Sequence, residues 1–126
     1  MSFFTYIMAS TRNGTLYTGS TDDLAKRYDE HFHKARDGFT AKYDVNRLVW
    51  FECHASRREA FRRERSIKEW RRTWKIELIE SINPTWRDLG AEFVRTSPFD
   101  LLIELTGSES PEPPARLDIP SQSAGD

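Results

Sequence analysis

The stretch FFTYIMASTRNGTLYTG, residues 3–19, determines the expected fold. Residues 3–9 are short, aromatic and β-branched, as strands are. Asn13 and Gly14 follow, and this pair supplies the positive φ angles of a tight reverse turn. Residues 15–19 then read as the returning strand, so the sequence predicts a β-hairpin over residues 3–19.

A helix is predicted directly after the hairpin, over the stretch STDDLAKRYDEHFHKARDG. Ser20 or Thr21 can cap its start, and Gly38 lies past its exit. Four residues share one stripe of this helix, the face that would cover the sheet: Leu24, Ala25, Tyr28 and Phe32.

The remaining elements complete a small α/β domain. Residues 47–55 are predicted as a strand, and Ser56 and Glu59 have the spacing of a capping box at the start of a second helix. Residues 73–82 continue as helix after a break near Arg72. The predicted order ββαβαα gives a single domain with a three-stranded antiparallel sheet flanked by helices.

The domain is expected to end near residue 95. Residues 96–126 form an acidic tail that is rich in Pro and Ser and has too little apolar content for a core. We expect this tail to be largely disordered, with residues 99–105 as the alternative, a short docked helix.

The composition excludes several classes of protein. A chain of 126 residues with 37% hydrophobic and 13% aromatic residues is typical of one globular domain. No apolar run approaches the roughly 20 residues of a membrane span, and the N-terminus lacks the basic lead of a signal peptide. The single cysteine, Cys53, excludes a disulfide framework and a Cys-rich zinc site. We expect a cytoplasmic protein without membrane contact.

The net charge of −1 conceals a segregation of charge. Residues 1–95 carry 18 Lys or Arg and 14 Asp or Glu, whereas residues 96–126 carry one Arg and six acids. Residues 57–75 alone contain nine basic residues and three Glu. Phosphate backbones attract such a patch, although a solvated helix face is the ordinary alternative.

Three local patterns could carry chemistry, each with a structural alternative. Arg27 and His31 are four residues apart at one edge of the buried helix stripe, a spacing that also occurs in structural pairs. Glu64 has apolar neighbours on its helix, so it needs a cation, and the candidates are Lys68 one turn on or a hard divalent metal ion.

The hairpin offers the third pattern. Tyr17 and Gly19 share one face of their strand, and Gly19 lets a ligand or backbone come close. Tyr6 lies on the opposite strand of the hairpin, and half-buried packing is the alternative for either tyrosine.

Together these residues resemble the signature of the GIY-YIG nuclease family, over about residues 2–90. The two name motifs correspond to residues 4–6 and 17–19, although Phe4, Thr5 and Thr18 depart from the usual residues. The other motif positions are Arg27, His31, Lys42 with Tyr43 in a loop, Glu64 and Asn83. The segments RRERSIKEW and NPTWRDL are similar to small stand-alone bacterial members, the UPF0213-like group.

The resemblance implies hydrolysis of phosphodiester bonds with one divalent metal ion, Mg²⁺ or Mn²⁺, held by Glu64. Arg27 would contact phosphate oxygens, and Tyr17 or His31 would act as the general base with Tyr6 orienting groups around it. Supporting positions would be Gly19, Lys42, Tyr43 and Asn83.

A basic surface would guide the nucleic-acid backbone to this site, independent of sequence. Its expected residues are Arg57, Arg58, Arg62, Arg63, Arg65, Lys68, Arg71 and Arg72. Tryptophans 70, 74 and 86 either stack on unpaired bases or pack in the core.

The leading hypothesis is therefore a metal-dependent endonuclease acting on DNA, structure-selective or weakly sequence-selective, in DNA repair or recombination. One alternative is a non-catalytic nucleic-acid-binding module that keeps the nuclease fold. A third hypothesis is an interaction protein whose tail recruits a protein partner.

Overall fold

The computed structural model describes residues 2–32 and 45–107. Three strands form its sheet: β1 (Phe3–Ala9), β2 (Leu16–Thr21) and β3 (Arg47–His54). The strand order is β2-β1-β3 and both pairings are antiparallel, so β2 is an edge strand. The predicted hairpin and the predicted fold class are confirmed.

The hairpin turn differs in detail from its prediction. Asn13 has a φ of 58°, but Gly14 does not adopt a positive φ. Ser10 Oγ accepts a hydrogen bond of 3.0 Å from the backbone N–H of Thr15, and the backbone N–H of Ser10 bonds to the Thr15 carbonyl. One left-handed residue is therefore enough to reverse the chain here.

The first helix, α1 (Leu24–Phe32), begins later than expected. Asp23 caps it, because Asp23 Oδ1 accepts a hydrogen bond from the backbone N–H of Lys26. Ser20 is instead part of β2, so the predicted cap at Ser20 or Thr21 was wrong. Leu24 is buried as expected, whereas Ala25 is exposed and does not belong to the covered stripe.

Helices α3 (Arg57–Lys68) and α4 (Arg72–Ile82) follow β3. Ser56 caps α3 by accepting a hydrogen bond from the backbone N–H of Glu59, which confirms the predicted cap. After α4 come a short 3₁₀ helix, η1 (Leu89–Val94), and α5 (Pro98–Thr106). Across the described residues, no helix has the length and apolarity needed to cross a membrane.

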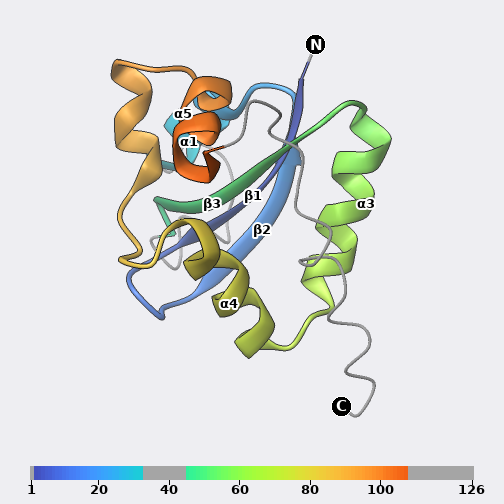
Figure 1. Ribbon diagram of the computed structural model, residues 1–126. Helices are drawn as coiled ribbons and strands as arrows, with labels where there is room; N and C mark the ends of the chain where they lie inside the picture. The colour runs from blue at the N-terminus through green and yellow to red at the C-terminus, as the bar shows by residue number, and fades with distance from the viewer. Residues whose placement is uncertain (1, 33–44, 108–126) are drawn as a thin grey trace.

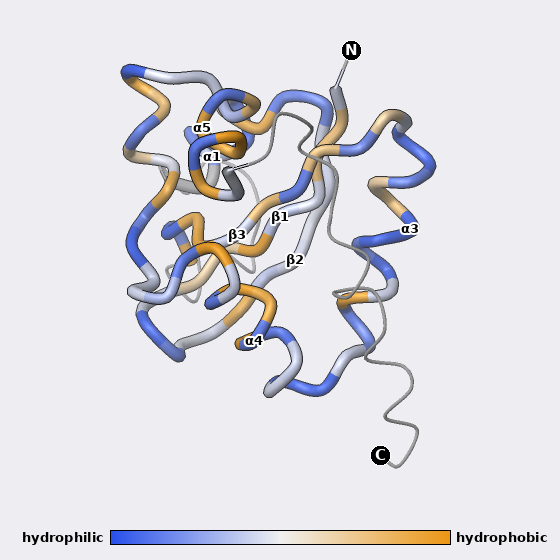
Figure 2. The backbone as a smooth tube through the Cα atoms, viewed as in Figure 1, coloured by the Kyte–Doolittle hydropathy of each residue, from blue (hydrophilic) through white to orange (hydrophobic). Residues whose placement is uncertain are grey.

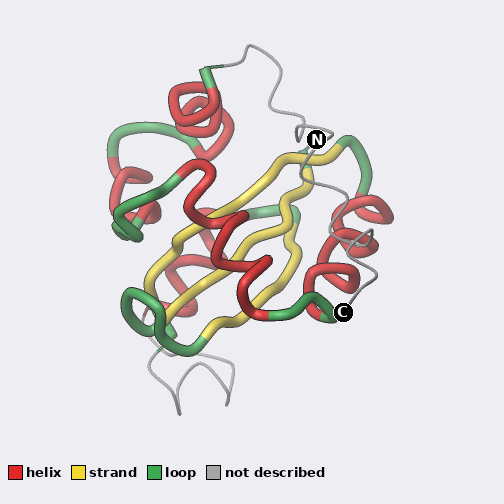
Figure 3. The backbone as a smooth tube through the Cα atoms, turned by 60° about the horizontal axis from the view of Figure 1, so that its bottom comes forward, coloured by secondary structure: helices red, strands yellow, loops and turns green. Residues whose placement is uncertain are grey.

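Helices lie on both sides of the sheet (Figures 1 and 3). One face packs against α1, η1 and α5 in a core that contains Phe4, Tyr6, Met8, Leu24 and Phe51. The other face packs against α3 and α4 in a core that contains Ile7, Trp50, Ile67, Leu78 and Trp86. Figure 2 shows that α3 is mainly hydrophilic apart from a few apolar residues.

Helix α5 extends the folded domain beyond the expected boundary at residue 95. Leu101 and Leu102 are buried against the first core, and Ser97 caps the helix through the backbone N–H of Asp100. The docked helix, which was the alternative for residues 99–105, is therefore the observed arrangement. The rest of the predicted tail, residues 108–126, lies outside the described residues.

Candidate functional site

Tyr6 and Gly19 are direct partners on the two strands of the hairpin. A Cβ atom built on Gly19 would lie 2.6 Å from Tyr6 Oη and 2.8 Å from Tyr6 Cζ. The tyrosine ring therefore lies across the glycine backbone, and only a residue without a side chain leaves room for it. The sequence predicted that a ligand or backbone would come close at Gly19, but the group that occupies this space is the Tyr6 side chain.

Arg27 joins this pair from α1. Its Nε donates a hydrogen bond of 3.2 Å to Tyr6 Oη, and its Nη1 lies 3.2 Å from Glu30 Oε1 on the same helix. The Tyr17 ring lies 6.4 Å from the Tyr6 ring, centroid to centroid. Tyr6, Tyr17 and Arg27, three residues predicted to act together, thus lie on one face of the sheet.

The Tyr6 phenol is held in its neutral form. Its side chain is almost completely buried, and burial raises the pKa of Tyr6 above the ordinary value for tyrosine. The hydrogen bond and the positive charge of Arg27 lower this pKa, but burial outweighs both. Tyr6 can therefore orient a neighbouring group through its hydroxyl, but it does not serve as a base near neutral pH.

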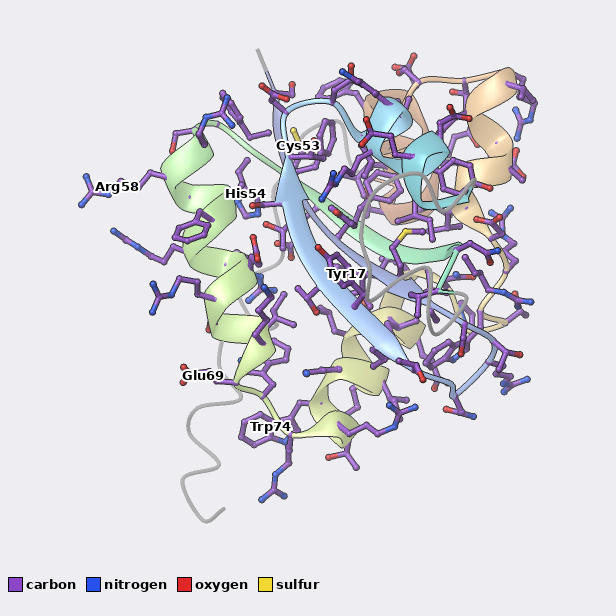
Figure 4. All side chains as sticks on the ribbon, turned by 180° about the vertical axis from the view of Figure 1, so that it is seen from behind. Tyr17, Cys53, His54, Arg58, Glu69 and Trp74 are labelled. Carbon is purple, nitrogen blue, oxygen red and sulfur yellow. The ribbon has the colours of Figure 1, made fainter. Side chains whose placement is uncertain are left out.

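Glu64 lies on the opposite face of the sheet from Tyr6 and Tyr17, beside the edge strand β2. Its Oε1 accepts a hydrogen bond of 2.7 Å from Ser20 Oγ, and its Oε2 lies 2.7 Å from Lys68 Nζ. Ser20 directly follows Gly19 on β2, so its side chain points to the opposite face, toward α3. Figure 4 shows β2 between α3 and the region of α1, with Tyr17 labelled on β2.

Glu64 and the two tyrosines therefore lie on opposite faces of the sheet, and Gly19 and Ser20 are the neighbouring residues of β2 that contact Tyr6 and Glu64, respectively. Burial is the main cause of the raised pKa of Tyr6, and the negative charge of Glu64 adds to it in the same direction. Glu64 is largely buried, as its apolar helical neighbours indicated, and Lys68 is the cation that pairs with it.

An open pocket of about 370 Å³ lies beside Arg27, where β2 ends and α1 begins. Its lining is polar and charged: Ser20, Thr21, Asp22, Asp23, Lys26, Arg27, Glu30 and Arg57. Arg57 contributes from α3 and pairs with Asp22 at 2.9 Å. The pocket thus brings the end of the hairpin, α1 and α3 together at a site where a phosphate could reach Arg27.

Sequence reasoning missed Ser20 and Glu30 as site residues. Ser20 was considered only as a helix cap, and the signal for its role was the strand alternation that turns it toward the opposite face from Gly19. Glu30 is three residues from Arg27, a spacing at which oppositely charged side chains meet on a helix.

The carboxylate that a divalent metal ion would use here is that of Glu64. No cluster of three or more His, Cys, Asp or Glu side chains suited to a metal occurs within residues 2–32 and 45–107. Mg²⁺ is nevertheless often held by one or two carboxylates, with water and substrate phosphate as its other ligands. Glu64 fits such an ion, because its carboxylate already attracts a cation, the ammonium group of Lys68.

The predicted basic surface divides into groups with different environments. Arg58, Arg62, Arg65 and Arg71 are exposed, and Arg58 points away from the molecule in Figure 4. Arg57 is exposed and paired with Asp22, Lys68 is paired with Glu64, and Arg72 donates to the carbonyl groups of Asn13 and Gly14 at 2.7 Å each.

Arg63 does not belong to the predicted nucleic-acid surface. Its Nε and Nη2 donate to the two carboxylate oxygens of Glu52, each at 3.0 Å, and both side chains are buried. His54 Nε2 lies 3.3 Å from Glu52 Oε1 in the same group. Arg63 therefore joins α3 to β3 and is not accessible to a nucleic acid.

Asn83, predicted as a supporting residue, has a structural role in the core. It is buried, its Nδ2 donates to the carbonyl groups of Val49 and Arg87, and its Oδ1 accepts from the backbone N–H of Arg87. Trp86 is buried in the core, and Trp70 and Trp74 are half-buried. His31 lies in α1, but its side chain is outside the described part of the structure, as are Lys42 and Tyr43.

Tyr6, Tyr17, Arg27 and Glu64 all lie within the first 77 residues, the part of the chain that contains the sheet and α3. Residues 2–77 match the GIY-YIG catalytic domain. The chain therefore belongs to the GIY-YIG family, whose domains form a nuclease superfamily, as its motifs predicted.

Two relatives of this chain are UPF0213 proteins of bacteria. The chain is 34% identical over 83 residues to a UPF0213 protein of Pseudomonas aeruginosa, covering 66% of this chain and 79% of that protein. It is 39% identical over 82 residues to a UPF0213 protein of Clostridium perfringens, covering 62% of this chain and 83% of the relative. These names specify neither a substrate nor an activity.

One solved structure is also similar. It is the solution structure of a UPF0213 protein from Bacillus halodurans, 26% identical, with a TM-score of 0.45. The similarity covers 77% of this chain and all of that protein.

Proposed function

We propose that this protein is a divalent-metal-dependent endonuclease that hydrolyses phosphodiester bonds in DNA, with structural or weak sequence selectivity. The observation that carries this proposal is the hydrogen bond between Arg27 and Tyr6, whose ring lies across Gly19 of β2, next to Ser20, which holds the Glu64 carboxylate on the other face. Membership of the GIY-YIG family supports it.

Arg27 is the group that would bind the scissile phosphate. Its side chain is 31% exposed and lines the pocket, so a phosphate oxygen can reach it from solvent. The planar guanidinium matches the geometry of phosphate oxygens, and its bonds to Tyr6 and Glu30 fix its orientation before the substrate binds. This preorganisation would stabilise the negative charge that develops on the phosphate.

Two residues compete for the role of proton acceptor from the attacking water. A free histidine titrates at about 6.5, which suits a base at neutral pH, whereas a free tyrosine titrates at about 10. Tyr17 is adjacent to Tyr6, and His31 lies one turn beyond Arg27 on α1. Rate–pH profiles of His31→Gln and Tyr17→Phe separate these roles, because only removal of the base abolishes the rise in rate with pH.

Glu64 would hold Mg²⁺ or Mn²⁺, with Ser20 orienting one of its carboxylate oxygens. A bound divalent ion supplies charge stabilisation for the phosphate and the leaving oxygen.

The exposed arginines of α3 would attract the DNA backbone without regard to sequence. Arg58, Arg62 and Arg65 are exposed on a helix that packs its other side against β1 and β2. Binding through such contacts depends on counterion release, so the affinity should fall steeply with salt.

Nicking of supercoiled and branched DNA in Mg²⁺ tests the proposal. The wild type should nick, and Glu64→Gln and Arg27→Ala should lose most of the rate. Glu69→Gln is the matched control, because Glu69 is an exposed acid at the end of the same helix (Figure 4). Equal nicking by wild type and Glu64→Gln would contradict the proposal.

A second candidate function is a nucleic-acid-binding module without turnover. The observation that favours it is that both carboxylate oxygens of Glu64 already have partners, Ser20 and Lys68. Salt-sensitive DNA binding by a wild type that shows no nicking in Mg²⁺ or Mn²⁺ would support this function.

A further inference from the structure

The two carboxylate oxygens of Glu64 have partners of different kinds. Ser20, which donates to Oε1, is half-buried on a strand of the sheet. Lys68, which pairs with Oε2, has a side chain that is 51% exposed, whereas the side chain of Glu64 is only 12% exposed. One partner is therefore fixed by the sheet, and the other is a flexible chain at the surface.

The position of Ser20 is fixed by its neighbours. Ser20 is the register partner of Thr5 on β1, and Thr5 Oγ1 donates a hydrogen bond of 2.8 Å to the carbonyl of Ala60. Ala60 lies one turn before Glu64 on α3, so helix and sheet are joined at two points next to the carboxylate. Hydrogen bonds from such neighbours orient metal-binding carboxylates and contribute to their affinity.

Lys68, unlike Ser20, is not held in place by the sheet. Its ammonium is a point charge on a four-carbon stem that can turn into solvent. A divalent ion bound to Oε2 would lie against this ammonium, and two positive charges at that separation repel each other. Lys68 and a metal ion therefore cannot share the carboxylate in the geometry observed at 2.7 Å.

We propose that Glu64 is a cation-exchange site in which Lys68 is the resident cation of the metal-free protein and is displaced when a divalent ion binds. Ser20 is the positioning residue that keeps the carboxylate oriented through the exchange. This inference rests on the proposed function, because it takes Glu64 as the metal ligand.

Mn²⁺ binding in the absence of DNA, measured by calorimetry and by the electron paramagnetic resonance signal of free Mn²⁺, tests the exchange. Lys68→Met should bind Mn²⁺ roughly two- to five-fold more tightly than the wild type, because the competing cation is removed. The matched control is Arg62→Met, which removes one positive charge from the exposed part of the same helix and should leave the affinity nearly unchanged.

Ser20→Ala should bind Mn²⁺ about ten-fold more weakly. Ser20→Thr keeps the hydroxyl and should restore the affinity to near the wild-type value, which separates orientation of Glu64 from a general effect on the fold. Ser66→Ala is the control, because Ser66 is an exposed serine of α3.

Glu64→Gln distinguishes the inference from the function on which it rests. Unchanged Mn²⁺ binding by Glu64→Gln would show that the metal does not bind at Glu64, and the proposed function would lose its metal ligand. Loss of binding in Glu64→Gln with wild-type affinity in Lys68→Met would overturn only the exchange. Wild-type affinity in Ser20→Ala would overturn the role of Ser20.

Discussion

Arg27 Nε donates a hydrogen bond to Tyr6 Oη, and this contact joins α1 to the central strand of the sheet. The phenol is buried and the guanidinium is partly exposed, so the contact links the core to the pocket. An arginine in this position is oriented by the core and still accessible to a substrate.

Arg27→Lys should therefore reduce nuclease activity although the charge is kept. Lysine has no planar fork and cannot bond to Tyr6 and to a phosphate in the same way, and loss of one such contact reduces kcat by roughly 10²–10³-fold. Nicking rates and thermal unfolding measure this. The exposed turn residue Arg12 provides the control as Arg12→Lys, and a wild-type rate in Arg27→Lys would contradict the assigned role.

Gly19→Ala should displace Tyr6. The new Cβ would lie 2.6 Å from Tyr6 Oη, and a buried ring has little room to move, so we expect a loss of stability of about 1–3 kcal/mol. Urea denaturation measures the free energy of unfolding. In a Tyr6→Phe background the cost of Gly19→Ala should be smaller, because the nearest atom is absent, and an equal cost in both backgrounds would show that the clash is with something else.

Arg63→Met should destabilise the protein, while Arg62→Met should not. Removal of Arg63 leaves Glu52 as a buried charge without its bidentate partner, which costs roughly 3–5 kcal/mol for a buried pair. Arg62 is exposed, so its replacement should change the free energy of unfolding by less than about 0.5 kcal/mol. Equal stability of the two variants would contradict the structural role of Arg63.

The raised pKa of Tyr6 predicts a loss of stability in alkaline solution. In the unfolded chain Tyr6 ionises at about pH 10, whereas in the folded protein it stays protonated to higher pH. Below pH 10 its contribution to stability is complete, and the contribution falls as pH rises from there toward the folded-state pKa, because the unfolded state releases the proton first. Denaturation at pH 8 and pH 11 should show a smaller loss for Tyr6→Phe than for the wild type, and equal losses would disprove this linkage.

Tyr28 should behave in the same way. Burial and the hydrogen bond to Asp88 Oδ2 at 2.6 Å raise its pKa as well. Tyr28→Phe should therefore also reduce the alkaline loss of stability, with little effect on Mn²⁺ binding, because Tyr28 lies in the contact between α1 and η1 and does not line the pocket. A changed Mn²⁺ affinity in Tyr28→Phe would show that the contact between α1 and η1 influences metal binding at Glu64.

The sequence by itself determined what depends on short separations along the chain. The hairpin over residues 3–19, the cap at Ser56 and the faces of Tyr6 and Tyr17 follow from turn chemistry, capping and strand alternation, which act within a few residues.

Only the tertiary structure decided which charged side chains meet. The sequence places Arg62 and Arg63 on one basic helix. In the structure Arg63 is buried and pairs with Glu52 on β3, so it stabilises the fold. Likewise, Ser20 and Glu64 are 44 residues apart, and their hydrogen bond exists because β2 pairs with β1 and α3 packs on both strands. A buried charged or polar group needs a hydrogen-bond or ion-pair partner, because water is excluded from it. Tertiary packing, and not spacing in the sequence, decides which residue is that partner.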